Sequence, residues 1–75
     1  MTLIAPRIEV DPLIRFGKAV IEGTRVLVSV VVGAVAAGDY WAEIAREYGI
    51  TEEDIRGALA YAASRLEEET VRAPL

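Results

Sequence analysis

Residues 41–58 read WAEIAREYGITEEDIRGA, and this stretch decides the predicted fold. A small residue, Ala45, is followed four positions later by Gly49 and six positions after that by Ile55. This spacing is typical of a helix-turn-helix, in which a glycine stands at the turn and the two helices pack closely. In many proteins with this motif the second helix enters the DNA major groove. The stretch therefore predicts two packed helices and makes DNA a ligand to consider.

The residues that flank the glycine turn predict where these two helices begin and end. Asp39 is a suitable N-cap for a helix over 40–48, which Gly49 ends. Thr51 is a suitable N-cap for a second helix that runs to about 69, with Asp54 completing an approximate capping box. Apolar residues that share one face of this helix predict its buried side: Ile55, Leu59, Ala62 and Leu66.

Residues 28–37 are ambiguous because they are rich in valine, which favours a strand. Ser29 as an N-cap, Gly38 as a stop and valines at helical spacing favour a helix, which we predict. Before it, residues 7–10 and 19–21 predict two short strands that form a hairpin. Residues 1–75 are expected to form one domain, with 1–6 and 70–75 as flexible ends.

The size and composition of the chain predict association. A chain of 75 residues without cysteine buries a limited share of its surface, yet 53% of its residues are hydrophobic. We therefore expect a homodimer or a complex with another protein. The longest uncharged run, residues 26–38, is too short to cross a membrane, and the lack of cysteine suits a cytoplasmic protein.

Charge is unevenly distributed along the sequence. Residues 39–69 hold nine acidic and three basic side chains, whereas residues 1–30 hold four basic and three acidic ones. A phosphate-binding surface is therefore expected in the N-terminal third. The candidate DNA contacts are Arg15, Lys18, Thr24 and Arg25, together with Arg56 from the last helix.

Two observations weaken DNA binding. Glu52, Glu53 and Asp54 stand at the start of the last helix, where acidic groups repel phosphates but stabilise a helix N-terminus. The turn at Gly23 also has two interpretations. Thr24 and Arg25 could contact a ligand, or Thr24 could bond locally while Arg25 pairs with Glu22 or Glu9.

Residues 17–26, GKAVIEGTRV, resemble the opening motif of a small prokaryotic family known as domain of unknown function 433. The resemblance continues to about residue 66 through Ala37-Gly38, Glu43-Ile44, Tyr48, Thr51, Glu53-Asp54-Ile55, Ala58-Leu59 and Tyr61-Ala62. The chain departs from the motif at Ala19 and Leu27, where proline is common, and at Glu22, where a basic residue is common.

This resemblance implies a mainly α fold, a three-helix homeodomain-like helix-turn-helix bundle with a short N-terminal β-hairpin. It also implies an antitoxin of a toxin–antitoxin pair, which inhibits a PIN-like ribonuclease and represses its own operon by binding operator DNA. The expected partner contacts are Tyr61, Arg65, Val71 and Arg72. The tail is either solvated or an arm that carries Arg72 into the carboxylates of the nuclease. The alternative function is a protein-interaction scaffold without DNA binding.

Enzyme chemistry has little support in the sequence. The chain has no histidine and no cysteine, and Ser29 and Ser64 have no evident base partner. It also lacks a phosphate-binding loop and calcium-loop spacing. We expect no catalytic residues, no cofactor and no metal site.

Overall fold

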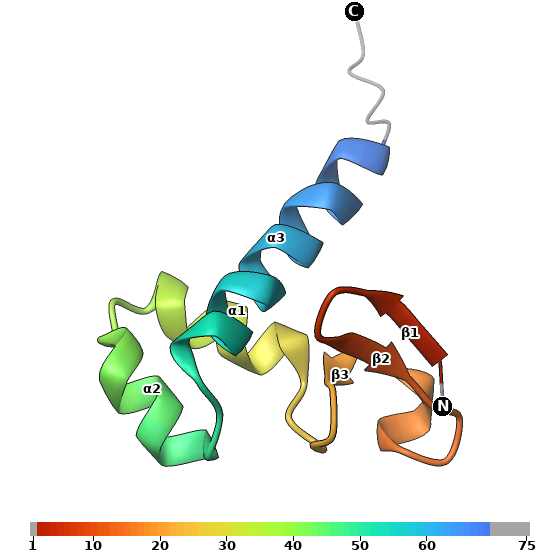
Figure 1. The fold of residues 1–75 in the computed structure, drawn as a ribbon. Helices are drawn as coiled ribbons and strands as arrows, with labels where there is room; N and C mark the ends of the chain where they lie inside the picture. The colour runs from red at the N-terminus through yellow and green to blue at the C-terminus, as the bar shows by residue number, and fades with distance from the viewer. Residues whose placement is uncertain (1, 70–75) are drawn as a thin grey trace, which may run out of the picture.

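The computed structural model describes residues 2–69, which form a small antiparallel sheet and three helices (Figure 1). The strands and a short 3-10 turn come first: β1 (Thr2–Ala5), β2 (Ile8–Val10), η1 (Arg15–Gly17) and β3 (Val20–Ile21). The helices follow: α1 (Val28–Ala36), α2 (Trp41–Tyr48) and α3 (Glu52–Glu68). The mainly helical character predicted from the sequence is confirmed.

The sheet has the order β1-β2-β3, with both neighbouring pairs antiparallel. The predicted hairpin between β2 and β3 is confirmed by the pairs Ile8↔Ile21 and Glu9↔Val20. The expectation of a flexible segment over 1–6 is wrong for residues 2–5, because β1 pairs with β2. Arg7 adopts a left-handed backbone (φ 69°) that turns the chain back after Pro6, which allows this pairing.

A second, narrower hairpin leads from β3 into α1. The Ile21 N–H donates to the Val26 carbonyl at 2.9 Å, and Gly23 at the tip has a φ of 76° that favours glycine. At the base, the Val28 N–H donates to the Ala19 carbonyl at 3.1 Å. This hairpin places the start of α1 beside the start of β3.

Helix α1 forms where the valine spacing predicted it, but its N-cap is Leu27 and not Ser29. Leu27 is extended and pairs with Val20 across the narrow hairpin, so the helix begins at the next residue and Ser29 lies within its first turn. Val28 and Val31 face the core and are buried. Gly38, at a φ of 90°, lies just beyond the helix end, as predicted.

Residues 49–51 join α2 to α3. Gly49 is left-handed, as the sequence indicated. The capping box at the start of α3 is also confirmed, because Thr51 Oγ1 accepts from the Asp54 N–H and Asp54 accepts from the Thr51 N–H. Asp39 is not the cap of α2, which begins after Tyr40 without a side-chain cap, since the Asp39 N–H still bonds back to Ala34.

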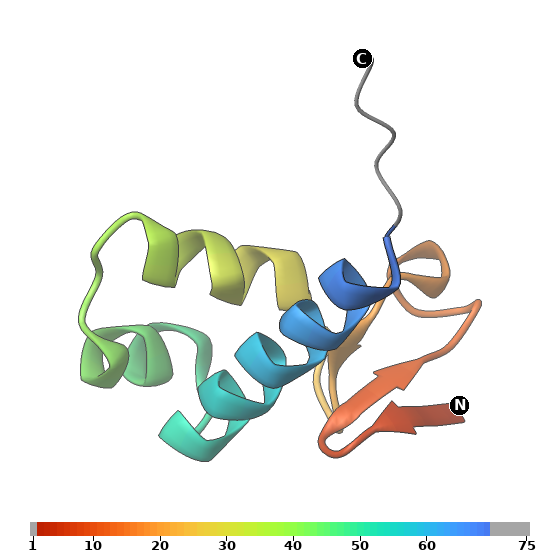
Figure 2. The ribbon, with the colours of Figure 1, turned by 90° about the horizontal axis from the view of Figure 1, so that it is seen from above.

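The core lies where the three helices meet the sheet, and α3 crosses the N-terminal part of α1 (Figure 2). Its buried apolar residues are Ile8, Val20, Ile21, Val28, Val31, Ile44, Ile50, Ile55 and Ala58. The prediction of which α3 residues are buried is confirmed for Ile55, which is fully buried, and wrong for Leu66, which is 65% exposed. The reason is visible in Figure 1, where the last turns of α3 extend beyond the sheet and the other helices.

Candidate interaction site

An open groove of about 720 Å³ lies between the first half of α1 and the second half of α3. Its wall on α1 consists of Val28, Ser29, Val32 and Gly33. Its wall on α3 consists of Tyr61, Ala62, Arg65 and Leu66. Lys18, Ala19 and Leu27 complete the lining. We call this feature the α1–α3 groove.

The groove is mainly apolar, and the charged residues that line it within residues 2–69, Lys18 and Arg65, are basic. Arg65 donates to Glu68 at 2.9 Å, and both side chains are more than 60% exposed, so this pair holds Arg65 only weakly. Lys18 forms no ion pair within residues 2–69. The groove therefore offers an apolar surface with basic side chains at its border.

Tyr61 stands between two hollows. It lines the α1–α3 groove and also a smaller one of about 220 Å³, which the turn between β1 and β2 forms with α3. Its side chain is half-buried and packs against the core, as do those of Trp41 and Tyr48. A half-buried tyrosine at the edge of an apolar groove is a common anchor in protein interfaces. The structure thus brings two predicted partner contacts, Tyr61 and Arg65, into one groove.

The turn at Gly23 is built from local bonds. The Thr24 hydroxyl donates to the Ile21 carbonyl at 2.8 Å and accepts from the Val26 N–H at 3.0 Å, so its single proton is used within the turn. The local bonding expected of Thr24 is confirmed, and a ligand contact of Thr24 stays a prediction. Arg25 is exposed and pairs with neither Glu22 nor Glu9. The alternative in which Arg25 forms a local ion pair is therefore wrong. Instead, the buried Glu9 carboxylate accepts from the Gly23 N–H at 3.1 Å.

The candidate DNA contacts come from separate segments of the chain. Lys18 precedes β3, whereas Arg25 follows it, near the tip of the narrow hairpin. Arg15 is exposed within the 3-10 turn. Arg56 donates to Glu53 at 2.7 Å and lies 5.4 Å from the centre of the Trp41 ring, so it is engaged within the domain.

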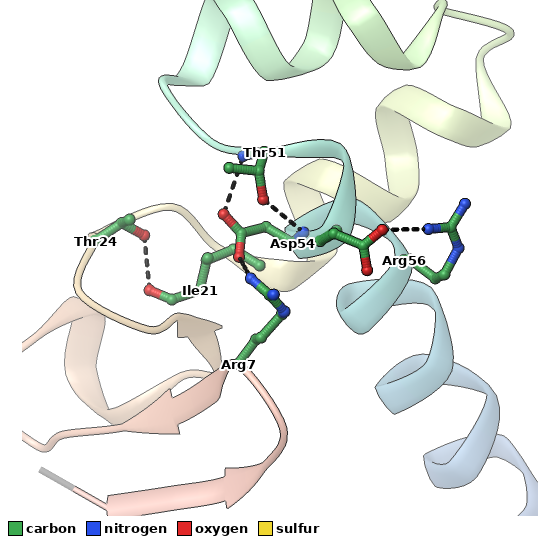
Figure 3. Close-up of polar contacts among 7 residues, drawn as sticks. Arg7, Ile21, Thr24, Thr51, Asp54 and Arg56 are labelled. Atoms are coloured by element: carbon green, nitrogen blue, oxygen red, sulfur yellow. Dashed lines mark hydrogen bonds and ion pairs between the residues drawn. The ribbon is translucent and has the colours of Figure 1, made fainter.

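The first turn of α3 is tied to the sheet by an ion pair (Figure 3). Arg7 donates to Oδ1 of Asp54 at 2.9 Å, while Oδ2 of the same carboxylate accepts from the Thr51 N–H. Burial raises the pKa of Asp54, but the bonds from Thr51 and Arg7 and the charge of Arg7 outweigh burial and hold the pKa below its ordinary value of 3.8. Two of the three acids at the start of α3 thus have structural partners, Asp54 and Glu53.

The lowered pKa of Asp54 predicts a pH-dependent contribution to stability. Its ionised form stabilises the fold above about pH 3.8, and this contribution is lost as the pH falls through the lower pKa of the folded state. We expect Asp54→Asn to reduce the free energy of unfolding by about 1 kcal/mol at pH 7 and by less at pH 2.5. Urea denaturation at both pH values measures this.

Glu52→Gln is the matched control, because Glu52 is an exposed carboxylate in the same helical turn with no bond within the described residues. We expect it to change the free energy of unfolding by only a few tenths of a kcal/mol. An Asp54→Asn effect of equal size at both pH values would contradict the assignment.

The sequence did not reveal most of the groove. Eight of its lining residues were not singled out as contacts: Ala19, Leu27, Val28, Ser29, Val32, Gly33, Ala62 and Leu66 lie outside the predicted sets, although Leu66 and Ala62 were expected to be buried. The signal in the sequence was the uncharged run over residues 26–38. A helix that buries one face carries polar residues on the other, so the absence of charge on every face indicates a second apolar contact surface. Val71 and Arg72, two further predicted partner contacts, lie outside the described residues.

Among residues 2–69, no group of three or more acidic side chains is arranged to hold a metal ion. None of the helices in this range is long and apolar enough to cross a membrane.

Comparison with known proteins identifies the family. The model of the family described as "Protein of unknown function (DUF433)" matches residues 8–62, and the chain therefore belongs to this family. A crystal structure of Rv2018 from Mycobacterium tuberculosis is similar, with 35% sequence identity and a TM-score of 0.65 over 69% of this chain. The match covers 24% of that chain, so this protein spans about a quarter of its length. No curated protein matches this sequence.

Proposed function

We propose that this protein is an antitoxin-like regulator that binds a PIN-like ribonuclease toxin and inhibits it, using the α1–α3 groove as its main contact surface. The observation that carries the proposal is the groove itself, an open apolar surface whose only charged lining residues are basic. As part of the same proposal, the three helices form a homeodomain-like helix-turn-helix, and the protein acts in the cytoplasm.

The chemistry of the groove supports a protein partner. Tyr61 offers an aromatic face beside the apolar side chains of Val32 and Leu66. Lys18 and Arg65 can pair with carboxylates, which cluster in a PIN-like ribonuclease. A partner helix with an apolar face and acidic residues along its border matches both properties. Val71 and Arg72 are proposed as further contacts.

The direct test uses this protein and the product of its neighbouring reading frame, which the proposal predicts to be a PIN-like ribonuclease. The two are co-expressed and purified by size-exclusion chromatography, and RNA cleavage by the nuclease is measured with and without this protein. The proposal predicts a stable complex with suppressed cleavage. A complex with undiminished cleavage would favour the scaffold function. The absence of a complex would contradict the antitoxin proposal and leave the scaffold function as the leading candidate.

DNA binding is the second candidate function. It is favoured by Arg15, Lys18 and Arg25, which are exposed and form no ion pair within the described part of the chain. The acidic start of α3 opposes the usual use of that helix in the major groove. We therefore place the DNA contacts on the segments that flank β3 and not on α3.

The salt dependence of DNA binding tests this placement. If all three basic residues contact phosphates, the logarithm of affinity falls with the logarithm of salt concentration at a slope of about −3 per protomer. We expect Lys18→Ala to reduce the slope by about 1, whereas Arg46→Ala, an exposed basic residue on α2, leaves it unchanged. An unchanged slope in Lys18→Ala would remove Lys18 from the DNA interface.

A further inference from the structure

The connection between β2 and β3 exposes two large apolar side chains. Phe16 is 97% exposed and Leu13 is 88% exposed, the highest values among the large hydrophobic residues of the described chain. Neither contributes to the core of its own domain. Their position in water is unfavourable unless another surface covers them.

The backbone of this connection is nevertheless held by hydrogen bonds. Asp11 accepts from the Leu13 N–H through its side chain and from the Ile14 N–H through its carbonyl, both at 2.9 Å. The Gly17 N–H donates to the Ile14 carbonyl at 3.1 Å. Arg15 and Phe16 take left-handed φ values of 50° and 58°, which are strained for residues with a side chain. The loop thus holds Phe16 outward in a strained conformation.

The loop is continuous with the α1–α3 groove. Phe16 lies two residues before Lys18, and Lys18 and Ala19 both line the groove. The segment that carries the apolar projection therefore leads directly into the lining of an apolar hollow. A twofold axis near this surface lets the projection of each copy meet the hollow of the other, which is the arrangement that symmetric dimers use.

Charge is also complementary between the loop and the end of α3. Arg15 and Lys18 flank Phe16 and form no ion pair within residues 2–69. Glu67 and Glu69 follow Leu66, the last groove residue on α3, and they too form no ion pair in this range. A second copy supplies the opposite charges at both ends of the contact, and Arg65 in the groove is already paired with Glu68.

We propose that the occupant of the groove in the free protein is a second copy of this chain. Phe16 of each copy enters the α1–α3 groove of the other, while Arg15 and Lys18 lie against the Glu67 and Glu69 of the other copy. The groove, at about 720 Å³, is larger than one side chain needs, so Leu13 enters with Phe16. The dimer contact does not depend on the toxin proposed above, but it uses the same groove, so the two partners exclude one another.

The first test measures self-association of the full chain without any partner, by sedimentation equilibrium from about 1 μM to 1 mM. The wild-type protein is expected to be a dimer in the upper part of this range. Phe16→Ser is expected to raise the dimer dissociation constant at least tenfold. Tyr40→Ser is the matched control, because Tyr40 is 76% exposed at the start of α2 and lies outside the groove, and it is expected to leave the constant unchanged.

The second test exchanges charges between the loop and α3. One variant carries Arg15→Glu and Lys18→Glu, and the other carries Glu67→Lys and Glu69→Lys. Each alone is expected to be a monomer because like charges meet in its dimer. An equimolar mixture is expected to form a heterodimer, because opposite charges meet at both contacts. Circular dichroism of each variant confirms that the fold is retained.

Three results would overturn the proposal. They are a wild-type protein that stays monomeric up to 1 mM, a dimer that Phe16→Ser does not weaken, and a mixture of charge variants that does not associate. A dimer that is weakened instead by Leu3→Thr and Ile4→Thr would place the contact at the exposed edge of β1. Because these assays contain only this protein, their failure leaves the toxin-binding proposal to its own test.

Discussion

Ile55→Ala is expected to lower the free energy of unfolding by about 2–5 kcal/mol. Ile55 is fully buried in the first half of α3 and belongs to the core cluster that joins the three helices to the sheet. A domain of this size has a total stability of roughly 4–11 kcal/mol, so the loss is a large share of the whole. We expect a large part of the variant population to be unfolded at 37 °C.

Urea denaturation followed by circular dichroism measures this loss. Leu66→Ala is the matched control, because Leu66 is an apolar residue of the same helix that is 65% exposed. We expect the control to change the free energy of unfolding by less than about 0.5 kcal/mol. Equal losses in the two variants would mean that α3 does not contribute to the core through the face described above.

Tyr61→Ala is expected to weaken binding of the partner ribonuclease by about 30-fold or more. An aromatic anchor at the centre of an interface contributes about 2 kcal/mol or more when it is truncated, which corresponds to a factor of this size. Tyr61 lines both the α1–α3 groove and the smaller hollow beside the turn between β1 and β2, so its truncation removes a side chain that both cavities share. Isothermal titration calorimetry with the purified nuclease measures the change.

The control for Tyr61→Ala is Tyr40→Ala. Tyr40 is exposed and lies outside both hollows, so its truncation is expected to leave the affinity unchanged. Because Tyr61 also packs against the core, thermal unfolding of both variants is recorded to show that they are folded at the titration temperature. An unchanged affinity in folded Tyr61→Ala would exclude the α1–α3 groove as the main contact.

Local signals in the sequence predicted the helical part of the fold. Gly49 in its left-handed conformation and the Thr51–Asp54 capping box are short-range features, so the sequence specifies them directly. The start of α1 was misplaced because pairing of Leu27 with Val20, a tertiary contact, sets it. Strand β1 was missed because its pairing depends on the left-handed turn at Arg7, a conformation uncommon in arginine.

The candidate site was harder to predict than the fold. Tyr61 and Arg65 were expected as partner contacts, and they do line one groove, although their role stays a prediction. Arg25 and Lys18 were expected to act together; they lie on segments before and after β3, and their joint role stays a prediction. Phe16 was missed entirely, because its exposure depends on two successive left-handed residues that no local sequence rule indicates for arginine and phenylalanine.

Amide hydrogen exchange of this protein, alone and in complex with the ribonuclease, tests the central claim most directly. The Phe16→Ser variant is used so that self-association does not protect the same surface. The account predicts that the nuclease slows exchange at residues 27–33 and 61–66, the two walls of the groove. Protection confined to residues 22–25 and the start of α3, with the groove unchanged, would contradict it.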